Sequence, residues 1–142
     1  KPVKVGDSFL EEFLIHTTSR GDAVRSKSEV IIADHLHTNK VQYHYEQPLT
    51  LDGVTKYPDF TIEDDEVGIT FYAEHCGMLS NPGYRSRWEE KKQWYIDHGI
   101  LPHEQGGGSK GTLIVTEDRP DGGISSKDIL NLVRTVIRRE KT

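Results

Sequence analysis

Two acidic residues lie in segments that otherwise favour β-strands, and they constrain this chain more than any other feature. Asp59 stands in Pro58-Asp59-Phe60, and Glu74 follows in the strand-like run 67–76. An acid in a strand is disfavoured by intrinsic preference, and burying its charge is unfavourable unless a partner compensates for it. Two acids on neighbouring strands indicate a shared cation, and oxygen ligands suit Mg²⁺ or Mn²⁺.

The pattern of apolar residues predicts an α/β fold. Helical periodicity covers residues 22–37, 81–98 and 125 onward. Strand-like runs cover residues 42–51, 56–63, 67–76 and 113–115. The order is helix, three-strand meander, helix, strand, helix. It predicts a three-layer sandwich in which helices flank a central mixed β-sheet on both faces.

Local signals mark the ends of these elements. Asp22 is expected to cap the first helix and Asn39 to stop it, while Ser125 and Ser126 cap the last one. Asp52-Gly53 predicts a hairpin turn. Residues 102–111 are rich in glycine but lack the Gly-Lys-Ser/Thr order of a phosphate-binding loop, so we expect a flexible linker there.

Composition limits the class of protein. The 142 residues, 34% hydrophobic and 29% charged, are typical of one folded domain with an ordinary core. No apolar run approaches the roughly 20 residues of a membrane helix, and the single cysteine, Cys76, excludes an internal disulfide. We expect a cytoplasmic protein without membrane contact. Because the chain starts at Lys1, we expect a fragment of a longer protein, with an N-terminal extension (1–21) before the domain (22–142).

Net charge is a weak argument against a nucleic-acid partner. The chain carries a net charge of −5, whereas nucleic-acid-binding domains are usually basic. Acids that bind a divalent metal are neutralised locally, however. Basic residues also cluster within 85–92 and 134–141. Composition therefore leaves DNA open as a partner.

Further candidate site residues come from the two helices that flank the strands. Glu29 is a third acid on the first helix, although a solvated helix acid is the alternative reading. Lys91 recurs with Tyr84, Trp88 and Tyr95 at spacings of four, three and four, which places it on the inward face of its helix. Such a lysine either snorkels to solvent or works near a metal, where it positions water or stabilises a transition state.

The two residues after Glu74 have different roles. Strand alternation puts Cys76 on the same face as Glu74, where it is expected to be a small buried residue. The side chain of His75 faces the other way, but its backbone carbonyl is able to reach a metal held by Glu74.

These motifs resemble the PD-(D/E)XK, or restriction-endonuclease-like, nuclease superfamily. The chain looks most like nuclease domains associated with UvrD/Rep-like helicases. The resemblance spans about residues 24–118. The matching pieces are Ser28-Glu29, Tyr45-Glu46, Pro58-Asp59-Phe60, Glu74-His75-Cys76-Gly77, Tyr84, Arg87, Lys91, Trp94, Tyr95 and Gly99.

The resemblance implies a metal site and a nucleic-acid surface. Carried over, Asp59 and Glu74 bind Mg²⁺ or Mn²⁺ and Glu29 completes the site, to which the His75 carbonyl is expected to add a ligand. Tyr84, Arg87 and Tyr95 are expected to contact DNA. The lysine that usually follows the second acid by two residues is replaced by Cys76. The resemblance then implies that Lys91, on the next helix, supplies the catalytic lysine.

The resulting hypothesis is a metal-dependent deoxyribonuclease. Its catalytic residues are Asp59, Glu74 and Lys91, its cofactor is Mg²⁺ or Mn²⁺, and its partners are DNA and a helicase or other domain of a repair or defence protein. The alternative is a weakly active or inactive module with the same fold that binds nucleic acid or protein. The missing lysine at Cys76 is the residue on which these two hypotheses divide.

Overall fold

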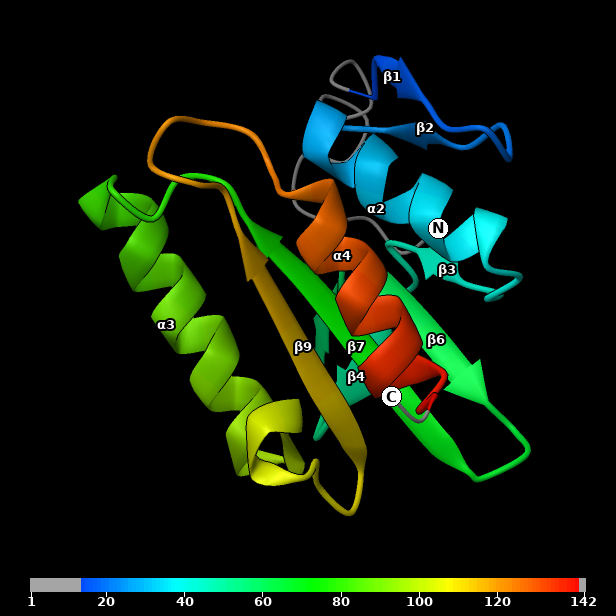
Figure 1. Cartoon of the computed structure of the whole chain (residues 1–142). Coiled ribbons are helices and arrows are strands. Elements are labelled where there is room, and N and C mark those ends of the chain that lie inside the picture. The colour runs from blue at the N-terminus through cyan, green and yellow to red at the C-terminus, as the bar shows by residue number, and fades with distance from the viewer. Residues whose placement is uncertain (1–13, 141–142) are drawn as a thin grey trace.

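A five-stranded mixed sheet lies at the centre of the computed structural model, which describes residues 14–140 (Figure 1). Its strands are, in spatial order, β3 (His44–Tyr45), β6 (Phe60–Asp64), β7 (Ile69–Cys76), β9 (Gly111–Glu117) and β8 (Ile100–Pro102). β7 pairs antiparallel with β6 and parallel with β9, and β8 also runs parallel to β9. The predicted α/β class and mixed sheet are therefore confirmed.

Helices cover both faces of this sheet. On one face, α2 (Lys27–Thr38) and α4 (Ser126–Leu132) lie side by side in front of the strands (Figure 1). Their buried residues form one core with Phe60, Phe71 and Ile114 of the sheet. Complete burial of each such apolar side chain contributes roughly 1.5–3 kcal/mol to stability.

The opposite face carries a second, smaller core. The helix α3 (Pro82–Asp97) packs there through Tyr95, which contacts Ile100 and Leu113 of the sheet. A separate hairpin, β4 (Leu49–Leu51) and β5 (Val54–Lys56), adds its leucines to this core. Strand alternation divides β7 between the two cores, because Phe71 and Ala73 face α2 and α4 while Tyr72 faces α3.

The first helix begins later than predicted. Ser26, not Asp22, caps α2, since its side chain accepts a hydrogen bond from the Glu29 amide at 3.2 Å. Asp22 instead accepts a hydrogen bond from the Tyr43 hydroxyl at 2.7 Å. The predicted stop at Asn39 is confirmed, because Asn39 is the C-cap.

The predicted N-terminal extension is partly built into the fold. Residues 23–24 form β2 (Ala23–Val24), which pairs with β1 (His16–Thr17). A boundary between residues 21 and 22 would therefore cut through a hairpin. The remainder of the predicted extension, residues 1–13, lies outside the described residues.

The predicted meander is confirmed in its order, since β3, β6 and β7 are antiparallel neighbours, but its first two strands are shorter than predicted and Asp59 lies just before β6. Residues 42–51 do not form one strand, because Glu46 has a φ of 51° and turns the backbone out of the extended region. β3 joins the central sheet before this turn, and β4 pairs only with β5 after it. The predicted turn at Asp52-Gly53 is confirmed, with φ values of 49° and 76° at its two residues.

The glycine-rich segment is a packed connection and not a flexible linker. Residues 100–102 form the edge strand β8, and the 3₁₀ turn η2 (His103–Gln105) follows it. A Cβ added to Gly108 would lie 2.1 Å from the carbonyl oxygen of Gly99. These glycines allow close backbone approach, which a spacer does not require.

The last helix follows its predicted pattern. Ser125 caps α4 by accepting a hydrogen bond from the Asp128 amide at 3.2 Å. The chain then widens into the π-helical turn η3 (Val133–Ile137). The buried side chains include Ile129, Val133 and Ile137, which confirms the predicted apolar face.

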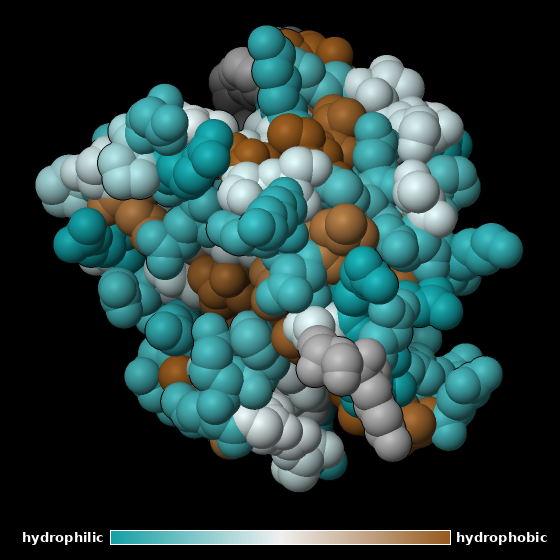
Figure 2. Space-filling model, viewed as in Figure 1, coloured by the Kyte–Doolittle hydropathy of each residue, from teal (hydrophilic) through white to brown (hydrophobic). Residues whose placement is uncertain are grey.

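The surface over α2, α4 and β9 is mainly hydrophilic. Figure 2 shows apolar residues on this face only in small separate areas. Within residues 14–140, no helix has both the length and the apolar content to cross a membrane.

Candidate functional site

A pocket of about 200 Å³ lies at the end of β7, beside the first turns of α3. It forms there because α3 starts only a few residues after β7 ends and packs back against the face of the sheet that carries Tyr72 and Glu74. Its lining residues are Asp59, Glu74, His75, Cys76, Tyr84, Arg87, Trp88 and Lys91. The structure therefore brings together residues that are up to 32 positions apart and that the sequence singled out separately.

Asp59 is held by the backbone of the neighbouring strand. The ladder between β6 and β7 ends at the pair Phe60–Ala73, so the amide of His75 has no strand partner on that side. It donates instead to Asp59 Oδ2 at 2.7 Å. Among the described residues, Oδ1 of Asp59 accepts no hydrogen bond, and this oxygen is not fully buried. This oxygen is left for a ligand in the pocket.

Glu74 is held at one oxygen only. Its side chain is 5% exposed, and Oε2 lies 2.7 Å from Nζ of Lys91. The hydroxyl of Tyr95 donates to the same oxygen in a short hydrogen bond. Within residues 14–140, Oε1 accepts no hydrogen bond, and it is not fully buried either. Glu74 therefore keeps one acceptor facing the pocket.

Lys91 points inward, as its helical spacing predicted. Nζ donates to the carbonyl oxygen of Tyr57 at 2.9 Å in addition to its contact with Glu74. The snorkelling alternative is therefore wrong. Burial opposes the charged ammonium, but Glu74 and Asp59 outweigh it and raise the pKa of Lys91. The pocket contains a fixed positive charge beside its two acids.

The acids together create a strong negative potential. Burial, followed by the charges of Glu74 and Glu29, raises the pKa of Asp59 well above its usual range. Lys91 opposes this shift only in part. Carboxylates this crowded hold their charges at neutral pH most favourably when a further cation lies between them.

Cys76 is a buried residue and not a nucleophile. Its side chain is 3% exposed, which confirms the sequence expectation. Burial and the charges of Glu74 and Asp59 raise the pKa of the thiol to about 12. The thiol is thus protonated at neutral pH and unreactive.

Glu29 lies near the site but does not line the pocket. It is 7% exposed, so the reading as a solvated helix acid is wrong. Its Oε1 accepts hydrogen bonds from the Tyr45 hydroxyl at 2.9 Å and the Arg25 amide at 3.0 Å. Desolvation raises the pKa of Glu29 against these hydrogen bonds. Glu29 influences Asp59 electrostatically, because its negative charge helps to raise the pKa of Asp59.

His75 presents only its backbone to the pocket. Its ring lies on the opposite face of β7, where Nδ1 is 2.8 Å from Oγ1 of Thr116 and Nε2 is 2.8 Å from Oδ1 of Asp118. The amide and carbonyl of one strand residue point to the same edge, so the carbonyl faces Asp59. It accepts a long hydrogen bond of 3.4 Å from the Tyr84 hydroxyl. A side-chain metal bond by His75 is thus excluded, and its carbonyl remains a candidate ligand.

The three predicted DNA contacts separate into two groups. Arg87 is exposed and Tyr84 half-buried, and both line the pocket. Tyr95 is 0% exposed and its hydroxyl is bonded to Glu74, so the expectation that it touches DNA is wrong. Tyr95 instead orients Glu74.

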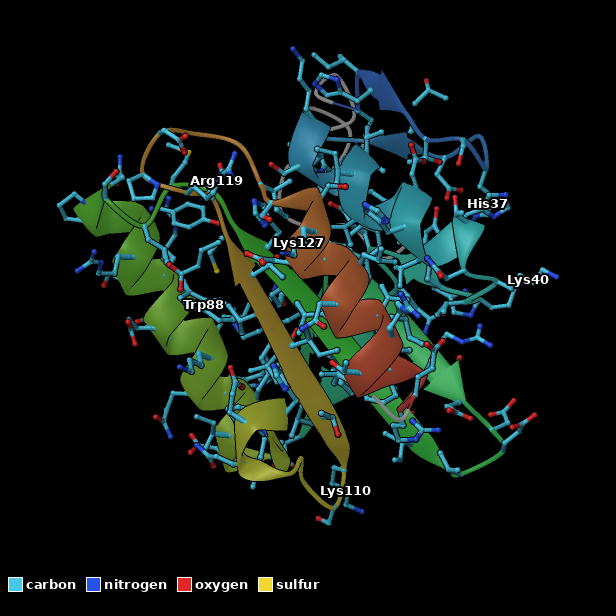
Figure 3. The ribbon with its side chains drawn as sticks, viewed as in Figure 1. His37, Lys40, Trp88, Lys110, Arg119 and Lys127 are labelled. Carbon is cyan, nitrogen blue, oxygen red and sulfur yellow. The ribbon has the colours of Figure 1, made fainter. Side chains whose placement is uncertain are left out.

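In Figure 3, Trp88 lies on the part of α3 that faces the sheet, and Arg119 lies just beyond the end of β9.

Sequence reasoning missed two groups that hold the site. The carbonyl of Tyr57 binds Lys91, and the only sequence signal for it is the following Pro58, which favours an extended backbone at residue 57. Asp118 binds the His75 ring. It lies between the predicted strand 113–115 and the predicted last helix, and nothing in its local pattern points to this contact.

The donors present fit a hard divalent cation. Within residues 14–140, no three or more His, Cys, Asp or Glu side chains are grouped so that they could hold a metal. The pocket offers two carboxylate oxygens, from Asp59 and Glu74, and the carbonyl of His75. Mg²⁺ is commonly bound through one or two carboxylates while it keeps several waters, whereas structural zinc needs four protein ligands. The donor set therefore suits Mg²⁺ or Mn²⁺ and not zinc.

Comparison with known proteins gives one distant similarity. Over 76 residues, 54% of its length, the chain is 34% identical to the uncharacterized protein MJ1519 of Methanocaldococcus jannaschii. The chain spans only 6% of that relative. No protein-family model and no solved structure matches the chain.

Proposed function

We propose that this chain is a metal-dependent nuclease domain that hydrolyses phosphodiester bonds in DNA. The observation that carries the proposal is the pocket at the end of β7, where Asp59, Glu74 and Lys91 converge. Two carboxylate oxygens that accept no hydrogen bond, a backbone carbonyl with only one long hydrogen bond and a fixed ammonium in one small accessible space meet the requirements of phosphodiester hydrolysis. A divalent cation bound there would supply positive charge to the scissile phosphate.

The residues of the chain divide the remaining tasks. Asp59 and Glu74 would hold the cation with the His75 carbonyl, and Tyr95 fixes the orientation of Glu74. Lys91, anchored by the Tyr57 carbonyl, directs its ammonium at the same space, where it would donate a hydrogen bond to a phosphate oxygen or to the attacking water. Exposed Arg87 at the rim would contact a neighbouring phosphate of the substrate.

The arrangement of elements is consistent with a restriction-endonuclease-like core. A helix precedes an antiparallel pair, β6 and β7, and the sheet then continues in parallel through β9. The acids lie at one end of this antiparallel pair. The similarity to a short part of a much longer archaeal protein supports a domain that works inside a larger polypeptide, and we propose a helicase-linked repair or defence protein as its context.

The test is cleavage of labelled DNA by the purified 142-residue chain with Mn²⁺ or Mg²⁺. We expect cutting that EDTA abolishes and that Asp59→Asn lowers by at least about a thousandfold, because one of the two carboxylate ligands is lost. The matched control is Asp65→Asn, an exposed aspartate in the turn between β6 and β7, which should cut at the wild-type rate. Wild-type cleavage by Asp59→Asn would refute the assignment.

A non-catalytic module is the second candidate, and Cys76 favours it, because the usual lysine is missing at that position. Titration calorimetry with Mn²⁺ separates the two. If the wild-type chain binds DNA but shows no Mn²⁺ binding, the result would support the non-catalytic module.

A further inference from the structure

A second polar cluster lies directly behind the pocket, on the face of β7 that packs against α2. Oδ1 of Asp118 accepts hydrogen bonds from Nε2 of His75 at 2.8 Å and from the Ser28 hydroxyl at 3.0 Å. Because a carboxylate only accepts, the proton of this imidazole bond sits on Nε2. The other ring nitrogen is 2.8 Å from Oγ1 of Thr116. The His75 side chain is 5% exposed, so its ring is fixed at both nitrogens inside the protein.

The register of the sheet explains how these groups meet. β7 and β9 run parallel with His75 opposite Thr116, so their side chains stand side by side on one face. Asp118 follows the end of β9, and its amide donates to the carbonyl of Cys76 at 3.2 Å. This bond extends the β7–β9 pairing to Asp118 and places its carboxylate within hydrogen-bonding distance of the His75 ring.

Thr116, His75 and Asp118 lie in the order of a hydroxyl, a base and an acid, but they do not form a hydrolytic triad. The small cavity that Thr116 lines has a volume of about 30 Å³, and apart from Glu74 and Thr116 its lining is apolar. No substrate carbonyl fits beside the hydroxyl in such a space. The cluster therefore has a role other than nucleophilic catalysis.

Asp118 links segments that carry all three acids of the site. Ser28 immediately precedes Glu29 on α2, and His75 immediately follows Glu74 on β7. The amide of the same His75 donates to Asp59 Oδ2 at 2.7 Å. One carboxylate thus fixes the segments whose displacement would move Glu29, Glu74 and Asp59 relative to one another.

Space for this carboxylate is reserved by a glycine. A Cβ added to Gly77 would lie 3.2 Å from Oδ2 of Asp118 and 3.9 Å from Nε2 of His75. The first distance is shorter than an ordinary van der Waals contact, so a methyl group at residue 77 would push Asp118 away from the ring. Gly77 is also not in a left-handed conformation, so its backbone does not by itself require glycine.

We propose that Asp118 is a positioning residue of the pocket, which acts through His75 to hold the Asp59 carboxylate and the start of α2 in place. This inference rests on the proposed function for its catalytic meaning, but the structural coupling stands without it. Asp118 does not line the pocket. Groups that orient metal ligands from behind typically change metal affinity by 10–100-fold when they are removed.

The first test needs no metal and uses the amide signal of His75 in ¹⁵N-resolved NMR spectra of the full chain. In Asp118→Ala we expect the His75 amide proton to move upfield and to exchange with solvent at least about tenfold faster, because its bond to Asp59 loosens. Asp118→Asn retains an acceptor oxygen for Nε2 and should stay close to wild type. Asp121→Ala, an exposed aspartate near Arg119, is the matched control without effect.

The second test is the Mn²⁺ dissociation constant from calorimetry. We expect Asp118→Ala to raise it about tenfold and Asp118→Asn to raise it less than about threefold. Gly77→Ala should shift both readouts in the same direction by a smaller amount, and it replaces Asp118→Ala if that variant does not fold. An unchanged His75 amide in a folded Asp118→Ala or Gly77→Ala protein overturns the proposal. A wild-type chain that binds no Mn²⁺ overturns the nuclease assignment instead, and the NMR test still decides the role of Asp118.

Discussion

Two ion pairs in this molecule have similar geometry but differ in whether the carboxylate keeps an oxygen without a hydrogen bond. Arg25–Glu46 and Lys91–Glu74 both have a closest nitrogen–oxygen distance of 2.7 Å. Their side chains are 20% and 5% exposed in the first pair and 24% and 5% in the second. Distance and burial therefore do not distinguish a structural pair from a functional one.

The difference lies in the second oxygen of each acid. Both oxygens of Glu46 are bonded to the Arg25 guanidinium, at 2.7 and 3.0 Å. Both bonds of Glu74 go to one oxygen, and Lys91 brings a compact ammonium in place of a two-pronged donor. The first pair is saturated and stabilises the fold, whereas the second leaves an acceptor in an accessible pocket. Unused hydrogen-bonding capacity is thus the better sign of a site.

Of the tests of this comparison, the largest effect is expected for the Lys91–Glu74 pair. Lys91→Ala should lower DNA cleavage by about 100–1,000-fold, because a fixed positive charge near the phosphate is lost. Cys76 lies on the same face as Glu74 and lines the same pocket, so Cys76→Lys in the Lys91→Ala background should restore part of the rate. Single-turnover cleavage rates measure both effects, and Lys92→Ala is the control. Wild-type cleavage by Lys91→Ala would remove Lys91 from the mechanism.

The Arg25–Glu46 pair should behave in the opposite way. Glu46→Gln should lower the free energy of unfolding by about 2–3 kcal/mol, since the Arg25 guanidinium loses its anionic partner. Cleavage per folded molecule should change less than about twofold, because the backbone amide of residue 46 still donates to the Asp59 carbonyl. Urea unfolding and cleavage rates at low temperature check this pair of expectations. A large loss of cleavage with unchanged stability would reverse the comparison.

The pH dependence of stability tests the crowding of acids. The pKa of Asp59 is raised in the folded state of the metal-free protein. Protonation of Asp59 therefore stabilises the folded state relative to the unfolded state, and this stabilisation is lost as pH rises from about 4. Asp59→Asn should therefore melt a few degrees higher than wild type at neutral pH without metal, and the gap should close near pH 4. Calorimetric melting curves across this range are the measurement. A gap that widens toward acid pH would contradict the assigned direction.

The smallest expected effect concerns the rim. Arg87→Ala should weaken DNA binding a few-fold and reduce the slope of log affinity against log salt by about one, as expected for one phosphate contact. Arg134→Ala, on η3, is the control. Fluorescence anisotropy at several salt concentrations gives the slopes. An unchanged slope would place Arg87 outside the binding surface.

The sequence was most informative where local physics decides the structure. The caps at Asn39 and Ser125 and the inward face of Lys91 follow from periodicity and side-chain chemistry near each residue. Glu74 and His75 were separated onto opposite faces by strand alternation alone. The same local reasoning failed at Glu46, because a left-handed backbone at a non-glycine residue is stabilised by tertiary contacts that no pattern reveals.

Asp59 and Glu74 were visible in the sequence because a charge in a strand-like segment needs compensation; that argument holds for Glu74 in β7, whereas Asp59 lies one residue before β6. What the sequence left open was how the compensation is made. Only the tertiary structure brought Lys91 to one oxygen of Glu74, left the other one open, moved Glu29 out of the pocket and placed Asp118 behind His75. These contacts join residues 16 to 90 positions apart, and they depend on strand register and helix packing, which the entire chain sets together.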